Sequence, residues 1–208
     1  MATILLTGFA PFDGADRNPS ADAVDAVAAG YDGLHRLISA VLPVSFAGAA
    51  ARLRALIAEH DPDAVIATGL AGGSDRVAVE RVGVNLMDAC IPDDDGEQPV
   101  DVPSEPDGPA ARFATLPVKR IVGVLEEAGI PVRASLSAGS YVCNHVLYTA
   151  LGASHPDVPT GFVHLPWTPA TAPEDAPSLS EGELARAVRL IVDHAFDPDD
   201  LRPGGSIW

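Results

Sequence analysis

The sequence contains few cysteines, and their placement limits the chemistry they can support. Cys90 and Cys143 are the only two among 208 residues, so the chain can form at most one disulfide. Neither residue lies in a Cys-x-x-Cys pair or a Cys/His cluster with the spacing of a metal site. We therefore expect at least one free thiol.

Basic residues and long apolar runs are also scarce. The 13 lysines and arginines face 29 aspartates and glutamates, which gives a formal charge of -16. Binding to a phosphate backbone needs a clustered basic surface, so we expect no nucleic-acid partner. No apolar run approaches the roughly 20 residues of a membrane helix, and the N-terminus lacks the basic-then-apolar plan of a signal peptide. We expect a cytoplasmic protein with no membrane association.

Apolar residues make up 47% of the chain, enough for one substantial core but not for two comfortable domains, so we predict a single domain over residues 1–208. Short β-prone runs alternate with segments of helical spacing, which predicts a parallel sheet covered by helices. The expected strands are 3–7, 37–44, 64–68, 131–136 and 160–165. The expected helices are 21–29, 47–57, 117–128, 142–151 and 180–196, the first after an Asn18-Pro19-Ser20 start signal and the last after a capping box at Ser180 and Glu183.

Two segments depart from this alternation. Residues 77–91 are more strand-like than helical, with valines at alternate positions. Residues 92–109 are acidic and rich in proline and glycine, which predicts an exposed loop or a lid-like excursion.

Cys143 is a candidate nucleophile because it falls in the first turn of a predicted helix, after a strand and a turn of small residues. The N–H groups and dipole at a helix start favour a thiolate, and they can stabilise an oxyanion on an attacked carbonyl. A free cysteine is also often a buried residue that only fills space, so the position of Cys143 alone does not decide its role.

His164 is the candidate base. It lies near the end of the predicted strand 160–165, and ligand sites of open α/β sheets lie at the carboxyl ends of their strands. Histidine can take the thiol proton and return one to a leaving amine, although a lone strand histidine is more often structural. The other histidines are less suitable, and His145 points about 200° around the helix from Cys143.

Glu80 lies among alternating valines, so a carboxylate buried there needs a partner. Arg81 is one possibility, and the distal nitrogen of His164 is the other. The preceding Gly69 to Ser74 lacks the ending of a P-loop and the spacing of a dinucleotide fingerprint, so we interpret it as a tight turn. Ser140 does not complete a Gly-x-Ser-x-Gly motif, which argues against a serine hydrolase.

Three blocks of sequence resemble the pyroglutamyl peptidase type I family of cysteine peptidases, also called pyrrolidone-carboxylate peptidases. The blocks are Leu6 to Gly14 with Asn18-Pro19-Ser20; Gly69 to Gly73 with Glu80-Arg81 and Asn85; and Ser137 to Asn144 with Gly161 to Pro166. Leu116 to Lys119 and Ile91 to Gly96 also look like family positions, so the resemblance covers nearly the whole chain.

The resemblance implies a single-domain, three-layer α/β/α sandwich with a mostly parallel open sheet, assembled as a homotetramer. It implies removal of N-terminal pyroglutamate from peptides without a metal or organic cofactor. By motif, Cys143 matches the nucleophile, His164 the base and Glu80 the orienting acid. The implied substrate-binding residues are Phe9 and Phe12, which flank the lactam ring, with Leu70, Ile91, Tyr141 and Val142.

Three positions differ from the family pattern. Bacterial relatives commonly have Gln at the position of Leu70, and Arg near Ser74 and at Cys90. Two other functions stay open at this point: a phosphorylase-like enzyme built on a similar open sheet, and a non-catalytic relative that binds pyroglutamyl peptides.

Overall fold

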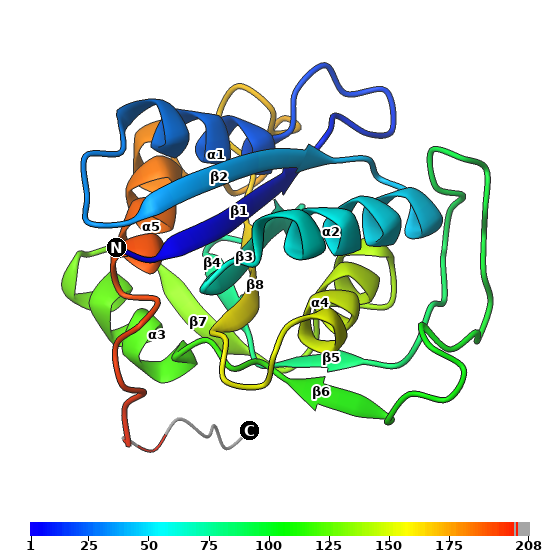
Figure 1. Ribbon diagram of the computed structural model, residues 1–208. Coiled ribbons are helices and arrows are strands. Elements are labelled where there is room, and N and C mark those ends of the chain that lie inside the picture. Colours follow the sequence, from blue (N-terminus) through cyan, green and yellow to red (C-terminus); the bar gives the residue numbers. More distant parts are fainter. Residues whose placement is uncertain (202, 204–208) are drawn as a thin grey trace.

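The computed structural model describes residues 1–201 and 203, and a six-stranded mixed sheet runs through its centre (Figure 1). In spatial order the strands are β2 (Arg36–Leu42), β1 (Thr3–Phe9), β3 (Ala64–Leu70), β8 (Thr160–Leu165), β4 (Val77–Glu80) and β7 (Val132–Ser135). The first four are parallel, whereas β4 runs antiparallel to β8 and parallel to β7. The prediction of a mostly parallel sheet is confirmed, and the reversal at β4 is the new feature.

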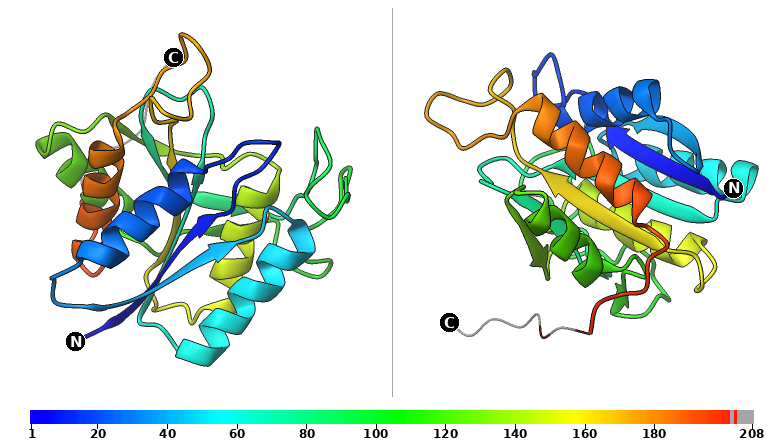
Figure 2. Two further views of the ribbon diagram at one scale, coloured as in Figure 1. Left: turned by 90° about the horizontal axis from the view of Figure 1, so that it is seen from above. Right: turned by 90° about the vertical axis from the view of Figure 1, so that its left-hand side faces the viewer.

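Helices cover both faces of this sheet (Figure 2). One layer consists of α1 (Pro19–Gly30), α3 (Val118–Glu127) and α5 (Glu181–Asp193), and the other of α2 (Phe46–His60) and α4 (Val142–Ala153). Alternate residues of β1 enter the two cores, with Ile4 and Leu6 beneath α1 and Leu5 beneath α2, as the two-residue period of a strand requires. The predicted α/β/α sandwich is therefore confirmed.

A two-stranded ribbon lies beside α4 and is formed by β5 (Val82–Val84) and β6 (Ala111–Phe113) (Figure 1). The prediction of strand for 77–91 is correct for β4, in the large sheet, and for β5, in the ribbon. After Val84 the chain continues as a loop. Residues 85–110 form the excursion between β5 and β6, longer than the predicted loop 92–109. Met87 and Val102 form an isolated bridge within it.

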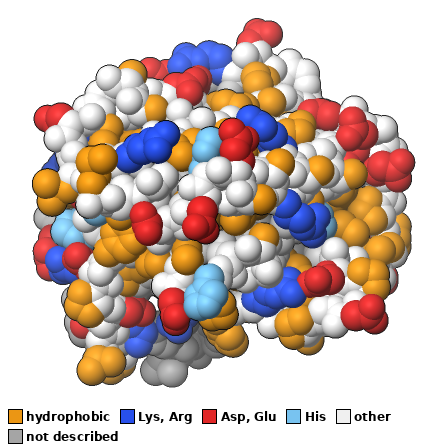
Figure 3. Space-filling model, viewed as in Figure 1, with side chains coloured by type: hydrophobic (Ala, Val, Ile, Leu, Met, Phe, Trp, Pro, Cys, Tyr) orange, Lys and Arg blue, Asp and Glu red, His pale blue; other side chains and the backbone are white. Residues whose placement is uncertain are grey.

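The starts of α1 and α5 follow the sequence signals, whereas α5 ends at Asp193 and not at the predicted residue 196. Asn18 accepts a hydrogen bond from the N–H of Ser20 at the start of α1, and the capping box of Ser180 and Glu183 is formed at the start of α5. Within the described residues, every helix is too short or too polar to cross a bilayer. Acidic and basic side chains are interspersed on the face shown in Figure 3.

Candidate active site

His164 and Glu80 meet across the antiparallel pair β8 and β4. In this register Ala78 is opposite His164, and Glu80 is opposite Phe162, two residues earlier on β8. Glu80 and His164 therefore share the face covered by α2 and α4, with the carboxylate deeper in the sheet. The His164 Nδ1 and Glu80 Oε1 atoms are 2.8 Å apart, and Glu80 is 1% exposed. This contact fixes the imidazole through Nδ1 and leaves Nε2 for a second partner.

Cys143 is placed to be that second partner, because it lies in the first turn of α4 and its side chain interacts with the His164 imidazole. Strand β3 passes close by: a Cβ atom on Gly69 would lie 3.0 Å from the Cys143 Sγ atom. Tyr141 precedes α4 without capping it by its side chain. The N–H groups of the first turn and the positive end of the helix dipole therefore lie at the position of Cys143.

The electrostatic environment favours a charged His164. Burial by itself lowers the pKa of this histidine, but the neighbouring Cys143 sulfur and then the Glu80 carboxylate outweigh it and raise the pKa to about 9. An imidazolium with this pKa is the natural counter-ion of a thiolate. The arrangement thus places a proton-holding imidazole beside the Cys143 sulfur.

A cavity of about 180 Å³ opens next to Cys143. Its walls are mostly apolar, and the Tyr141 ring packs against that of Phe12, with 5.8 Å between centroids, and against the Phe46 ring behind it, with 5.3 Å. The cavity is lined by Phe9, Phe12, Ala15, Arg17, Asn18, Val44, Leu70, Tyr141, Val142 and Cys143. A small apolar ring bound there would lie against the thiol.

Comparison with known proteins finds one family whose members resemble this chain over nearly its whole length. The model of the family described as pyroglutamyl peptidase matches residues 2–197. The chain belongs to the pyroglutamyl peptidase family.

Curated relatives support this at high coverage. A pyrrolidone-carboxylate peptidase of Clavibacter michiganensis is 46% identical over 195 residues, covering 92% of each chain. One from Escherichia fergusonii is 43% identical over 212 residues, covering 99% of each chain.

Solved structures agree with the fold. The pyrrolidone carboxyl peptidase of Thermococcus litoralis superposes with a TM-score of 0.93 at 36% identity, covering 98% of this chain and 99% of its own. The pyroglutamyl peptidase I of Bacillus amyloliquefaciens gives 0.92 at 38% identity, covering 97% and 100%.

Five of the six residues that the pyroglutamyl peptidase resemblance implied as substrate-binding line the cavity: Phe9, Phe12, Leu70, Tyr141 and Val142. Ile91 does not line it and lies 40% exposed on the excursion.

The three departures from the family pattern occupy different surroundings. Leu70 lines the cavity, whereas the Ser74 hydroxyl donates to the backbone oxygen of Arg76 in an exposed turn. Cys90 is an exposed free thiol. Of the three, Leu70 alone is part of the cavity wall.

Sequence reasoning missed four lining residues: Ala15, Arg17, Asn18 and Val44. The sequence indicates a helix start at Asn18, and the structure adds that its amide donates to the Ala10 oxygen and so holds the segment that carries Phe12. Arg17 forms ion pairs with Asp22 and Glu181, at 3.0 Å each, and these tie the same segment to α1 and α5. Asn18 is a polar residue within a matched block, which is a signal, whereas Arg17 falls between two matched blocks and carries none.

Asp93 is a further residue whose role the sequence did not reveal. It is 6% exposed, and its carboxylate accepts from the N–H groups of Phe46, Asp95 and Glu97. The excursion is thereby fastened to the start of α2. Next to it, the Tyr141 hydroxyl donates to the Pro92 oxygen, and burial, followed by the charges of Asp93 and Asp94, raises the pKa of Tyr141 to about 12.

The surroundings of Glu80 and His145 decide two points that the sequence leaves open. Glu80 pairs with His164, and within the described chain it makes no ion pair with Arg81. His145 is buried against the Phe46 ring, 5.8 Å between centroids, on a different side of α4 from Cys143. His145 is thus a core residue.

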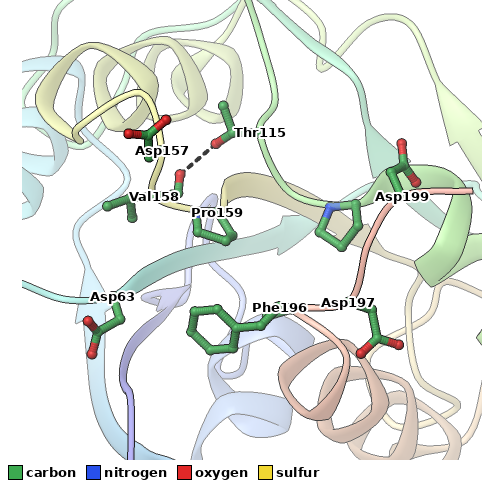
Figure 4. A pocket seen from close by; sticks show the side chains of 10 residues that line it. Asp63, Thr115, Asp157, Val158, Pro159, Phe196, Asp197 and Asp199 are labelled. Atoms are coloured by element: carbon green, nitrogen blue, oxygen red, sulfur yellow. Dashed lines mark hydrogen bonds between the residues drawn. The ribbon is translucent and has the colours of Figure 1, made fainter.

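A larger hollow of about 490 Å³ lies at the other end of the sheet (Figure 4). Asp63 and Pro159 line it just before β3 and β8 begin, whereas His164 lies near the end of β8. Asp197 at its rim is already paired with Arg120. This hollow is therefore separate from the candidate active site. Across residues 1–201 and 203, His, Cys, Asp and Glu side chains form no group of three able to hold a metal ion.

Proposed function

We propose that this protein is a cysteine peptidase that removes N-terminal pyroglutamate from peptides. The observation that supports the proposal is the series Cys143, His164 and Glu80, in which Cys143 lines a small apolar cavity and the other two lie behind it. A nucleophile next to a base that is oriented by a carboxylate is the set of groups that acyl transfer requires.

In this mechanism His164 takes the proton of Cys143, and the sulfur attacks the pyroglutamyl carbonyl carbon. The N–H groups in the first turn of α4 stabilise the resulting oxyanion. The His164 proton then passes to the departing amine, which leaves as the shortened peptide, and a thioester remains on Cys143. A water molecule deprotonated by His164 hydrolyses the thioester, and Glu80 holds the imidazole in orientation through both halves.

Substrate choice follows from the character of the cavity. The five-membered lactam of pyroglutamate is neutral and compact, so aromatic and aliphatic walls cost it little desolvation. A free N-terminal ammonium would need a counter-charge there. Among the described lining residues, Arg17 is the one with an acidic or basic side chain; it is a cation paired with Asp22 and Glu181, so it provides no such counter-charge.

The test compares hydrolysis of a pyroglutamyl amide with that of prolyl and glutaminyl amides. We expect turnover of the first only, its loss in Cys143→Ala, and its retention in the matched control Cys90→Ser. Iodoacetamide is expected to inactivate by modifying Cys143 before Cys90. Normal turnover in Cys143→Ala, or tight binding of pyroglutamyl peptides with no hydrolysis by the unmodified chain, would contradict the proposal.

We also propose that the whole chain works as one peptidase domain, in the cytoplasm, as a homotetramer. Two unpaired cysteines suit a reducing compartment, in which a nucleophilic thiol stays reduced. Light scattering coupled to size-exclusion chromatography measures the mass directly, and a monomeric mass at working concentration would contradict the tetramer.

A further inference from the structure

Asn144, the residue after Cys143, is buried completely and forms hydrogen bonds that the mechanism above does not use. Its Oδ1 atom accepts from the Val84 N–H at 2.9 Å. Its Nδ2 group donates to the carbonyl oxygens of Val84 and Leu86, both at 2.9 Å. Both amide donors are therefore used, and the side chain binds the end of β5 as a neighbouring strand would.

Ser140 adds a second attachment between the same two segments. Its carbonyl oxygen accepts from the Asp88 N–H at 2.9 Å, and its hydroxyl donates to the Asp88 oxygen at 2.7 Å. Residues 140–144 on the nucleophile side are thus bonded to residues 84–88, three times through Asn144 and twice through Ser140.

The bonded segment 84–88 follows Glu80 closely in the chain. Only Arg81 separates Glu80 from β5, and β5 lies flush against α4 (Figure 1): a Cβ atom on Gly83 would come within 3.0 Å of the Tyr148 nitrogen. The chain from Glu80 to Val84, which Asn144 binds, is therefore short and packed against α4. A shift of α4 relative to β5 would therefore change the position of Cys143 relative to His164 and Glu80.

From these contacts we infer that Asn144 is a positioning residue, which holds the first turn of α4, and with it Cys143, in register with the Glu80–His164 pair. The inference rests on the proposed function, because it assumes that Cys143 is the nucleophile. A buried amide that donates and accepts is suited to this role, because its removal leaves the Val84 N–H without its acceptor and the Leu86 oxygen without its side-chain donor.

Asn85 offers a matched control on the same segment. Its side chain also makes three hydrogen bonds: it donates to the oxygens of Glu105 and Gly108, and it accepts from the Glu105 N–H. These bonds close the base of the excursion and do not touch α4. Asn85→Ala therefore weakens the same region without releasing the turn that carries Cys143.

The experiment measures kcat and KM for a pyroglutamyl amide and the pH dependence of Cys143 alkylation in Asn144→Ala and Asn85→Ala. A small misplacement of a reacting group costs up to about a hundredfold, so we expect Asn144→Ala to lower kcat about 10- to 100-fold with KM within about threefold. Its alkylation profile should also move to higher pH. Asn85→Ala should keep kcat within about threefold and leave the profile in place.

Equal losses of kcat in the two variants, or an unchanged kcat in folded Asn144→Ala, would overturn the inference. If Asn144→Ala does not fold, Ser140→Ala decides, since it removes one bond of the same attachment: a smaller fall in kcat supports the role, and wild-type kcat and alkylation overturn it. The proposed function is judged separately, by whether the unmodified chain hydrolyses the substrate at all.

Discussion

Replacing Glu80 by glutamine tests what the negative charge next to His164 contributes, because the size and shape of the side chain stay the same. Glutamine keeps the Oε1 acceptor for the 2.8 Å contact with Nδ1. The Oε2 atom has no hydrogen-bond partner among the described residues, so an amide nitrogen can take its place without breaking a bond. A hydrogen bond to a charged group contributes about 1.5–3 kcal/mol. Losing that charge should lower kcat/KM for a pyroglutamyl amide about 10- to 100-fold and move the pKa of His164 down from about 9.

The assay is the pH dependence of kcat/KM from neutral to alkaline pH. In the unmodified chain the alkaline limb should reflect loss of the His164 proton near pH 9, and in Glu80→Gln it should lie at lower pH. Asp75→Asn is the control, because it removes an exposed carboxylate, paired with Arg76, from the turn between β3 and β4. A Glu80→Gln protein that folds normally, with kcat/KM within about threefold and the same alkaline limb, would refute the reasoning.

Three further perturbations have defined outcomes. Burial, and then the charge of Arg54, lowers the pKa of His145 to about 4. An unfolded histidine titrates near 6.5, so the unfolded chain binds the extra proton as pH falls. The native state should lose about 2 kcal/mol between about pH 7 and about pH 5, a loss that urea unfolding of His145→Gln should not show. Gly69→Ala places a Cβ atom 2.7 Å from the Phe162 ring and 3.0 Å from the Cys143 sulfur, so turnover should fall at least about tenfold, while Gly182→Ala, with open space around it, should keep full activity. Asp93→Ala leaves three backbone N–H groups without their acceptor and should cost about 2–4 kcal/mol in the free energy of unfolding, whereas an unchanged urea midpoint would contradict the anchoring role of Asp93.

The layer architecture was predictable from sequence because apolar period and helix-start signals act locally. The strand predicted at 160–165 is β8, with the same bounds, and the capping box marks the start of α5. The reversal of β4 was not predictable, since a strand four residues long carries no signal of its direction. Its direction is set by its neighbours, where Ala78 pairs with His164 on one side and with Arg133 on the other.

The site residues divide in a similar way. Cys143 and His164 could be nominated from their places at a helix start and near a strand end, but their contact depends on the packing of α4 against the sheet. The partner of Glu80 could not be chosen from sequence, because Arg81 was adjacent and His164 was 84 residues away. The roles of Asp93 and Asn144 depend on backbone N–H and carbonyl groups of distant segments, which no residue pattern specifies.

The strand order has a consequence for how the protein is made. β8 lies between β3 and β4, yet it is synthesised after both of them and after every other strand of the sheet. While the chain emerges from the ribosome, β3 and β4 each present an edge that stays unpaired until residues 160–165 arrive. Inserting this strand completes the sheet and delivers His164 to Cys143 in the same step. The nascent chain therefore carries its thiol without the imidazole beside it, and the proposed site forms only once β8 is in place.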